Sequence, residues 1–289
     1  MKNFLNKKLF KDYFHQNNKM KIFELKTSEG YVFKLLIELL SNNIKTGCFI
    51  IDETGITLRS IDTYKKILID ISLPHDKFNV YKFVSPNKLY VGLNMGHLHK
   101  MLKTIKKKDS IHILIDDTDP TELIIKMIPK DHNRLSTSYI KIQTIQNIDI
   151  DKPTTDKKPS IVLSNELQKT IKDLSNLGGI INIESINTQI KLSCSNGVLK
   201  REILFGDNDS SSGEQIVTNR TYSTEQLSRI TKICGLSSSV QMYTSNTSPL
   251  IIKSNIGNIG NISVFIKSNE QIEVESCMTI EVDDDSESD

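Results

Sequence analysis

The chain has 289 residues, which is enough for one large domain or two domains of ordinary size. Its 37 basic and 35 acidic side chains nearly balance, but every charged residue after Lys267 is acidic. Without those nine acids, 26 acidic side chains face 37 basic ones, a net charge of +11. The four cysteines show no metal-ligand spacing, and no apolar run is long enough to cross a bilayer. Composition therefore argues against a zinc module and a membrane protein, and it indicates reduced cysteines in the cytosol or nucleus.

Residues 1–20 form a basic N-terminal arm. The arm lacks the continuous apolar stretch and the small-residue cleavage site of a secretory signal. We expect it to be disordered, as is common for chain termini.

Four amphipathic helices are predicted along the rest of the chain. They span Ser28–Asn43, Asn94–Lys107, Ser164–Leu177 and Ser223–Cys234. Apolar residues at three- and four-residue spacing give each helix one core face, and the opposite faces are polar and mostly basic. One such helix would indicate only a solvated face. Four of them at matching places in two half-chains indicate a shared positive surface, which suits a phosphate backbone.

The order of elements occurs twice. Residues 21–146 alternate a strand and a helix with several strands, and residues 159–268 repeat this order. The sequence Pro-Thr-Glu-Leu-Ile-Ile-Lys at 120–126 is echoed by Pro-Leu-Ile-Ile-Lys at 249–253. We therefore predict two copies of one α+β unit, joined by an exposed connector at 147–158 and followed by an acidic tail at 269–289. Ser164 and a capping box at Ser223-Thr-Glu-Gln226 are predicted to start the last two helices.

No catalytic or metal-binding constellation is evident. A glycine-rich phosphate loop is missing, and the six histidines show no zincin-type pairing with an acid. Asp116, Asp117 and Asp119 lack the pattern of a calcium loop and are interpreted as a turn. We predict no enzyme activity, no cofactor and no metal.

Several collinear motifs carry a family resemblance. They include Phe23-Glu-Leu-Lys-Thr-Ser-Glu-Gly30, Gly55-Ile-Thr-Leu-Arg-Ser-Ile-Asp62 and Leu89-Tyr-Val-Gly-Leu-Asn94 in the first half. Leu236-Ser-Ser-Ser-Val240 and Pro249-Leu-Ile-Ile252 continue them in the second half. Each motif is weak alone, but their order resembles proliferating cell nuclear antigen, the eukaryotic sliding clamp, from about residue 21 to residue 267.

The resemblance implies the α+β DNA-clamp fold and a homotrimeric ring of six similar domains. Antiparallel sheets would form the outside, and the helices would line a hole that encircles duplex DNA. Ring closure would pair Leu135–Gln143 of one subunit with Val198–Phe205 of the next. Glu225 and Ser41 stand where the family usually has basic residues. The DNA-facing positions it implies are Lys34, Lys100, Lys103, Lys107, Lys169, Lys172, Arg229 and Lys232.

The family also has a pocket for partner peptides under the connector. The matching residues are Ile61, Lys65, Ile148, Ile150, Pro249 and Phe265. They suit a hydrophobic and aromatic peptide plug. The implied partners are duplex DNA bound without sequence preference, a DNA polymerase, other proteins with a clamp-binding peptide, and a clamp loader.

The expected function is therefore that of a non-enzymatic DNA sliding clamp. Alternatives are a subunit of a heterotrimeric clamp in damage signalling, a clamp serving viral late transcription, and a DNA-modifying enzyme. The bias toward Ile, Asn and Lys suggests an AT-rich genome such as that of a large DNA virus or a protist. The expected location is the nucleus, or a cytoplasmic replication factory for a viral protein.

Overall fold

The computed structural model describes residues 20–130, 135–145, 150–155, 158–206 and 217–284, without the side chains of 278–284. Within them one βαβββ unit occurs four times. The first unit comprises β1 (Lys21–Thr27), α2 (Gly30–Asn43), β2 (Thr46–Asp52), β3 (Gly55–Ile61) and β4 (Ile67–Pro74). A 3-10 turn η1 (His75–Lys77) and an additional strand β5 (Val80–Phe83) follow it.

The other three units have the same order of elements. The second comprises β6 (Leu89–Asn94), α3 (Met95–Leu102), β7 (Ser110–Asp116), β8 (Asp119–Ile128) and β9 (Ser136–Lys141). The third comprises β10 (Ser160–Leu163), α4 (Ser164–Ser175), β11 (Ile180–Ile186), β12 (Gln189–Ser195) and β13 (Lys200–Phe205). The fourth comprises β14 (Val217–Ser223), α5 (Thr224–Ile230) with a 3-10 turn η2 (Thr231–Gly235), β15 (Ser239–Tyr243), β16 (Leu250–Ile256) and β17 (Gly260–Ile266).

The units are interlocked in pairs. In each unit the last three strands form an antiparallel meander, and the first strand joins the meander of the other unit in the same half. Thus β1 pairs with β7, β6 with β2, β10 with β15, and β14 with β11. The sequence echo at 120–126 and 249–253 falls on β8 and β16, the middle strands of two meanders.

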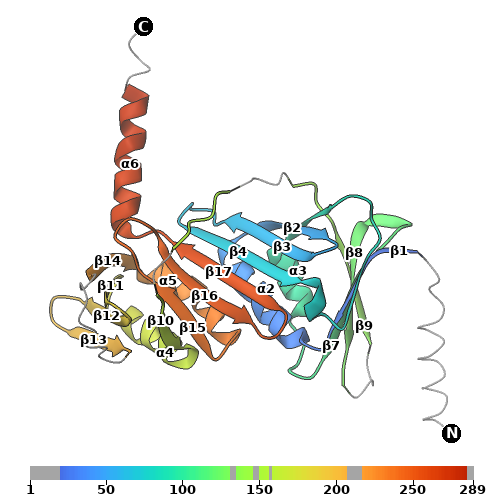
Figure 1. Cartoon of the computed structure of the whole chain (residues 1–289), viewed down its shortest axis with the longest axis horizontal. Coiled ribbons are helices and arrows are strands. Elements are labelled where there is room, and N and C mark those ends of the chain that lie inside the picture. Colours follow the sequence, from blue (N-terminus) through green and yellow to red (C-terminus); the bar gives the residue numbers. More distant parts are fainter. Residues whose placement is uncertain (1–19, 131–134, 146–149, 156–157, 207–216, 285–289) are drawn as a thin grey trace.

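The last strands of the units join the two halves of the chain. Strand β17 pairs with β4 and so creates one eight-stranded sheet of order β10-β15-β16-β17-β4-β3-β2-β6. The other two last strands, β9 and β13, are edge strands of a five-stranded and a four-stranded sheet. Figure 1 places β9 and β13 at opposite ends of the molecule.

The helices form one layer against the sheets. Contacts run from α3 to α2, from α2 to α5 and η2, and from these to α4. In Figure 1 strands β4, β17 and β16 lie in front of α2. The core between the layers is aliphatic, and Leu36, Ile37, Leu39 and Leu40 of α2 are fully buried. This arrangement is the α+β architecture expected from the sequence.

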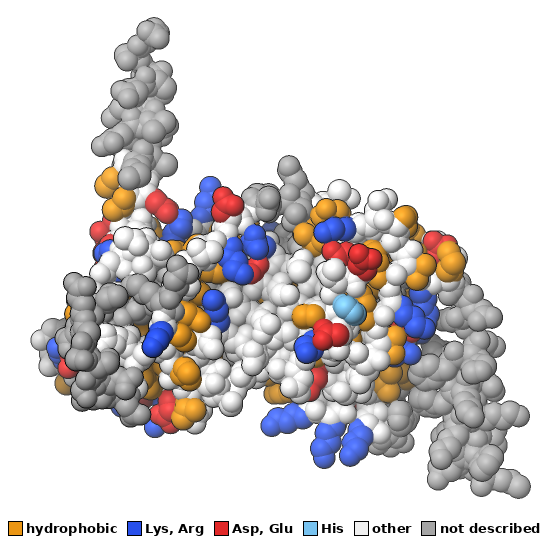
Figure 2. Space-filling model, in the orientation of Figure 1, with side chains coloured by type: hydrophobic (Ala, Val, Ile, Leu, Met, Phe, Trp, Pro, Cys, Tyr) orange, Lys and Arg blue, Asp and Glu red, His pale blue; other side chains and the backbone are white. Residues whose placement is uncertain are grey.

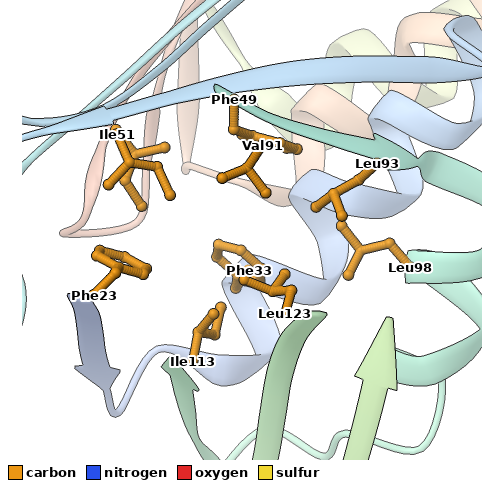
Figure 3. A pocket seen from close by; sticks show the side chains of 10 residues that line it. Phe23, Phe33, Phe49, Ile51, Val91, Leu93, Leu98, Ile113 and Leu123 are labelled. Carbon is orange, nitrogen blue, oxygen red and sulfur yellow. The ribbon is translucent and has the colours of Figure 1, made fainter. Parts of the chain in front are cut away.

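A small apolar cavity of about 30 Å³ remains in the core of the first half. Phe23, Phe33, Phe49, Val91 and Leu123 are among the side chains that surround it, and Figure 3 shows them converging from β1, α2 and neighbouring strands. Because its lining is entirely apolar, we interpret this space as a packing defect of the core.

Helix α3 is shorter than predicted, because it ends at Leu102 rather than at Lys107. The ammonium group of Lys34 donates to the carbonyls of Lys103 (2.8 Å) and Ile105 (3.2 Å), which a continued helix would have used. The carboxylate of Asp109 accepts from the backbone N–H of Lys106 (2.9 Å) and holds a turn there instead.

Of the two predicted helix starts, Ser223 is the N-cap residue of α5 but does not form the predicted capping box, whereas Ser164 is not a cap. Ser223 makes no side-chain cap bond, and Thr224 instead donates from its backbone N–H to the Gly179 carbonyl at 2.9 Å. Ser164 is the first residue of α4 rather than its cap, and its hydroxyl is buried without a hydrogen-bond partner among the described residues. The side-chain bonds do not form because Ser223 is the last residue of β14 and Ser164 directly follows β10, so that sheet pairing determines the backbone direction at both positions.

The C-terminal segment, predicted only as an acidic tail, begins as helix α6 (Asn269–Asp284). Ser268 and Gln271 start it with a reciprocal capping box. The Gln271 side chain accepts from the Ser268 N–H at 3.0 Å, and the Ser268 hydroxyl accepts from the Gln271 N–H at 3.3 Å. Figure 1 shows α6 projecting away from the sheets.

Candidate nucleic-acid and partner interfaces

Five of the eight predicted DNA-facing cations are exposed. They are Lys100, Lys103, Lys107, Lys169 and Lys172. Lys100 belongs to α3, and Lys169 and Lys172 to α4, each on the side away from the buried leucines of its helix. Across the described part of the chain, no carboxylate lies within 4.0 Å of these five ammonium groups. Lys103 and Lys107 lie just after the end of α3. The charge of all five lysines is therefore available to an anionic ligand.

The other three predicted cations have partners within the chain. Lys34 closes the end of α3, as described above. Lys232 pairs with Glu38 of α2 at 2.8 Å. Arg229 pairs with Asp62 at 3.0 Å, and the Asp62 side chain is completely buried. Sequence periodicity placed these residues on polar helix faces but could not identify their partners.

Asp62 is a structural residue that the sequence analysis did not single out. Its second oxygen accepts from the backbone N–H groups of Lys66 (2.7 Å) and Ile67 (2.8 Å), so it fixes the turn between β3 and β4. Arg229 reaches this turn from α5, and its guanidinium carbon lies 5.3 Å from the ring centroid of Tyr64. The pair therefore connects the helix layer to the turn that carries Lys65.

The opposite face of the eight-stranded sheet carries an apolar row. On β17, Ile262, Val264 and Ile266 belong to the core, so alternation turns Phe265 to the other face. Cross-strand pairs continue from Phe265 to Leu68 and Ile61 on one side and to Ile251 and Tyr243 on the other. We call these five residues the outer row.

Exposure varies along the outer row. Ile61 is 39% exposed, whereas Phe265, in the middle of the row, is only 2% exposed. Pro249 is half-buried and precedes β16, so strand alternation places it on the same face as Ile251. Lys65 is exposed and has a positive φ of 57° in the turn between β3 and β4.

The described part of the connector lies along this face. The guanidinium of Arg59 donates to the carbonyl of Ile150 at 2.7 Å and pairs with Asp70 at 3.0 Å. Lys152 pairs with the other oxygen of Asp70 at 3.0 Å. These contacts hold half-buried Ile150 beside the outer row, and Ile148 lies outside the described residues.

Charges of both signs are interspersed over the sheet side, as Figure 2 shows. In the parts of the chain that the structure describes, no group of three or more His, Cys, Asp or Glu side chains could hold a metal ion. No helix there is both long and apolar enough to span a membrane. All four cysteines are free thiols.

Comparison with known proteins decides the family. The model of the N-terminal domain of proliferating cell nuclear antigen matches residues 22–152, and that of its C-terminal domain matches residues 156–269. The chain belongs to the proliferating cell nuclear antigen family. Its second family domain ends at the first residue of α6, so most of α6 is additional to the family pattern.

Two viral proteins are similar in sequence to most of this chain. A protein of Paramecium bursaria Chlorella virus 1 described as a probable DNA polymerase sliding clamp is 25% identical over 257 residues, which cover 85% of this chain and 96% of the relative. An uncharacterized protein of Invertebrate iridescent virus 6 is 26% identical over 279 residues, which cover 84% of this chain and 91% of that relative.

Proposed function

We propose that this family member is the sliding clamp of a DNA replication system, a processivity factor that encircles duplex DNA and tethers a polymerase and other replication proteins. The family match and the viral clamp relative support this role. Family clamps act as scaffolds rather than as enzymes. We infer that a clamp loader places this clamp on DNA. We also infer that the clamp works where its DNA is replicated, in the nucleus or a viral factory.

The arrangement of the four units carries the proposal of a ring. Two of the last strands, β4 and β17, already pair with each other inside the chain. The equivalent strands β9 and β13 are left as edges at opposite ends. An edge at each end pairs head to tail with the next copy, and such contacts close into a ring when the rotation permits. We infer three copies, which give six halves.

The DNA contacts proposed are the five exposed lysines on or just after helices α3 and α4. Such a surface binds the phosphate backbone electrostatically and without sequence preference. The partner peptide is proposed to lie along the outer row, between the connector and Pro249, with Lys65 at its edge. Ile148 stays part of this proposal as a connector residue.

A proline at one edge position tests ring closure. The backbone N–H of Ile142 donates to Thr121 on the β8 side, so alternation turns the N–H of Tyr139 to the open edge of β9. Tyr139→Pro therefore removes a donor for the next subunit while the β8–β9 ladder keeps its bonds. Tyr139→Thr is the matched control, because it removes the aromatic side chain but keeps the backbone N–H.

Sedimentation at tens of micromolar should show trimers for the wild type and for Tyr139→Thr, and mainly monomers for Tyr139→Pro. A wild type that stays monomeric would refute the ring.

A second experiment tests whether the trimer encircles DNA. After incubation with a clamp loader and ATP, the trimer should stay on a nicked circular plasmid through gel filtration and leave when the plasmid is linearised. Equal loss from circular and linear DNA would contradict encirclement.

A further inference from the structure

The five-stranded sheet has a second face, on the side away from the helix layer. The odd-numbered residues of β7 belong to the core, so alternation turns His112 and Leu114 to this second face. Leu114 pairs across the strands with Glu24 of β1 and Ile124 of β8, and this row ends at Tyr139 of β9. We call the surface formed by these five residues the back face.

Three residues of the back face are as buried as core residues. Leu114 and His112 are each 2% exposed, and Glu24 is 6% exposed. Side chains stand roughly perpendicular to a sheet, so neighbours in the same row shield the flanks of Leu114 but leave its tip open. Among the described helices and strands, the closely packed neighbours of β7 are β1, β8 and, on the core side, α2. The tip of Leu114 therefore needs a cover that these elements do not supply.

His112 points to the same need for a cover. Its Nε2 atom lies 2.8 Å from a carboxylate oxygen of Glu24, whereas its Nδ1 atom is buried without a hydrogen-bond partner in the described part of the chain. The ammonium groups of Lys21 (2.9 Å) and Lys26 (3.5 Å) also lie at Glu24 and account for the burial of this carboxylate. Because an unpaired buried polar atom is costly, the cover of the back face should bring a partner for Nδ1.

The N-terminal arm ends beside the back face. The carbonyl of Met20 accepts from the backbone N–H of Asp117, in the turn between β7 and β8, at 3.0 Å. Asp117 is three residues beyond Leu114, which corresponds to about 10 Å along a strand. The arm has 19 residues before Met20. A helix of about 14 of them would be about 21 Å long, whereas β1 to β9 spans only about 15 Å. The arm is therefore long enough to cross the face.

The arm also has the side chains that such a cover requires. Five of its apolar residues recur mostly at spacings of three and four, and they are Leu5, Leu9, Phe10, Tyr13 and Phe14. In a helix they would form one apolar stripe, with Lys8 and Lys11 on the other side. The arm also contains four Asn and one Gln before Met20, and their amides can donate to or accept from an imidazole nitrogen.

We propose that residues 1–19 dock through their apolar side chains on the back face and cover Leu114 and His112, in place of the disorder expected for a chain end. The occupant of this face is thus a segment of the chain itself. Because the family domain begins at residue 22, this cover is an addition to the family pattern. The row that it protects runs to Tyr139 on β9, so the arm also shields apolar surface beside the edge proposed to close the ring.

Thiol labelling tests the cover on the full-length protein. In Leu114→Cys the new thiol should react slowly with a maleimide, and mass spectrometry of the β7 peptide distinguishes it from the four native cysteines. Deletion of residues 1–19 should raise this rate at least about tenfold, because protection is lost with the cover. Leu123→Cys is the matched control. Leu123 is 4% exposed on the core side of the neighbouring strand β8, so a thiol there should stay protected with and without the arm.

Two double variants of the arm sharpen the test in the full-length chain. Leu9→Asp with Phe10→Asp should expose the thiol at position 114 as the deletion does, because carboxylates resist burial on an apolar face. Lys8→Asp with Lys11→Asp adds the same side chains on the other side of the stripe and should keep the protection. A synthetic peptide of residues 1–19 should restore protection to the truncated chain.

Three results would overturn the proposal. The first is rapid labelling of the thiol at position 114 in the full-length chain, which would mean that the back face is open. The second is unchanged protection at position 114 after deletion of the arm, which would mean that other residues cover Leu114. The third is an equal effect of the two double variants, which would mean that the apolar stripe does not hold the arm in place.

Discussion

The ion pair between Arg229 and Asp62 shows how one residue can look like a DNA contact and serve the fold. Arg229 lies on a polar helix face, but its side chain is only 19% exposed and its guanidinium bonds a carboxylate with no exposure at all. Removing the cation would leave that carboxylate buried and unpaired, which is the costly way to break a buried pair. Asp62 also holds the β3–β4 turn, so strain would spread to the edge of the outer row.

We therefore predict that Arg229→Ala lowers the free energy of unfolding by about 2–4 kcal/mol. Lys169→Ala, on an exposed face of α4, should change it by less than about 0.5 kcal/mol. Urea denaturation followed by circular dichroism measures both. A similar small effect for the two variants would return Arg229 to the group of DNA-facing cations.

A second buried charge cluster predicts a dependence on pH. The Nε2 atom of His112 lies 2.8 Å from a carboxylate oxygen of Glu24, and both residues are buried. Burial and the charge of Lys26 lower the pKa of His112 to about 4. Burial opposes ionisation of Glu24, but the hydrogen bond and charge of Lys21 and the charges of His112 and Lys26 lower its pKa to about 2.

Both shifts make acid unfavourable for the folded chain, because the unfolded chain binds protons more readily. The contribution of His112 is present above pH 6.5 and is lost as the pH falls toward 4. That of Glu24 is present above pH 4.5 and is lost toward pH 2. We predict that stability falls by about 2–3 kcal/mol between pH 7 and pH 4. His112→Asn should reduce this slope in thermal melts. If the slope is unchanged in this variant, other titratable groups cause the loss of stability in acid.

At the scale of elements, the junction of β17 and β4 depends on a residue without a side chain. A Cβ atom at Gly260 would lie 2.2 Å from the carbonyl oxygen of Ser72 and 2.8 Å from a methyl group of Leu73. Gly260 is at the start of β17, where the two halves of the chain meet in one sheet. The backbones can approach this closely only because no side chain intervenes.

Gly260→Ala should destabilise the chain by about 1–3 kcal/mol, as overpacking of a tight contact does. Gly179→Ala is the matched control, since nothing lies within 4 Å of a Cβ atom there. Chemical denaturation of both variants compares them directly. If the two variants are equally stable, the junction has more freedom than its geometry indicates.

Periodicity predicted the repeated elements, because alternation of two and spacing of three to four residues are local properties. It extended α3 too far, since the bonds from Lys34 that end this helix come from 69 residues away. It could not separate Lys232, which Glu38 neutralises, from Lys172, which is exposed. Helix α6 was missed even though Ser268 and Gln271 carry the spacing of a capping box, a signal that was available in the sequence.

For the whole molecule, the lysines of the helix layer should act as a sum of weak contacts. Each neutralised phosphate contributes about 0.9 to the slope of log affinity against log salt. Reversal of Lys100, Lys103 and Lys172 to Glu should therefore reduce this slope by about 2–3 and weaken retention on circular DNA. Reversal of the exposed Lys77, Lys82 and Lys130, which lie outside the helix layer, should change neither. Equal effects of the two triple variants would mean that DNA binding depends on the net charge of the protein and not on the position of these lysines.

The exchange of first strands between units has a consequence for the order in which the chain folds during synthesis. Strand β1 finds its meander partner only when β7, more than 80 residues later, has been made. Strand β4 stays an open edge until β17, the last strand that the structure describes, arrives. No single βαβββ unit can complete its own sheet. A ribosome stalled between α3 and β7 therefore holds a chain in which β1 lacks β7 and β4 lacks β17. Such long-range pairing is slow and leaves edges exposed to aggregation. Newly made chains should thus require holding by a chaperone until residue 266 has left the ribosome.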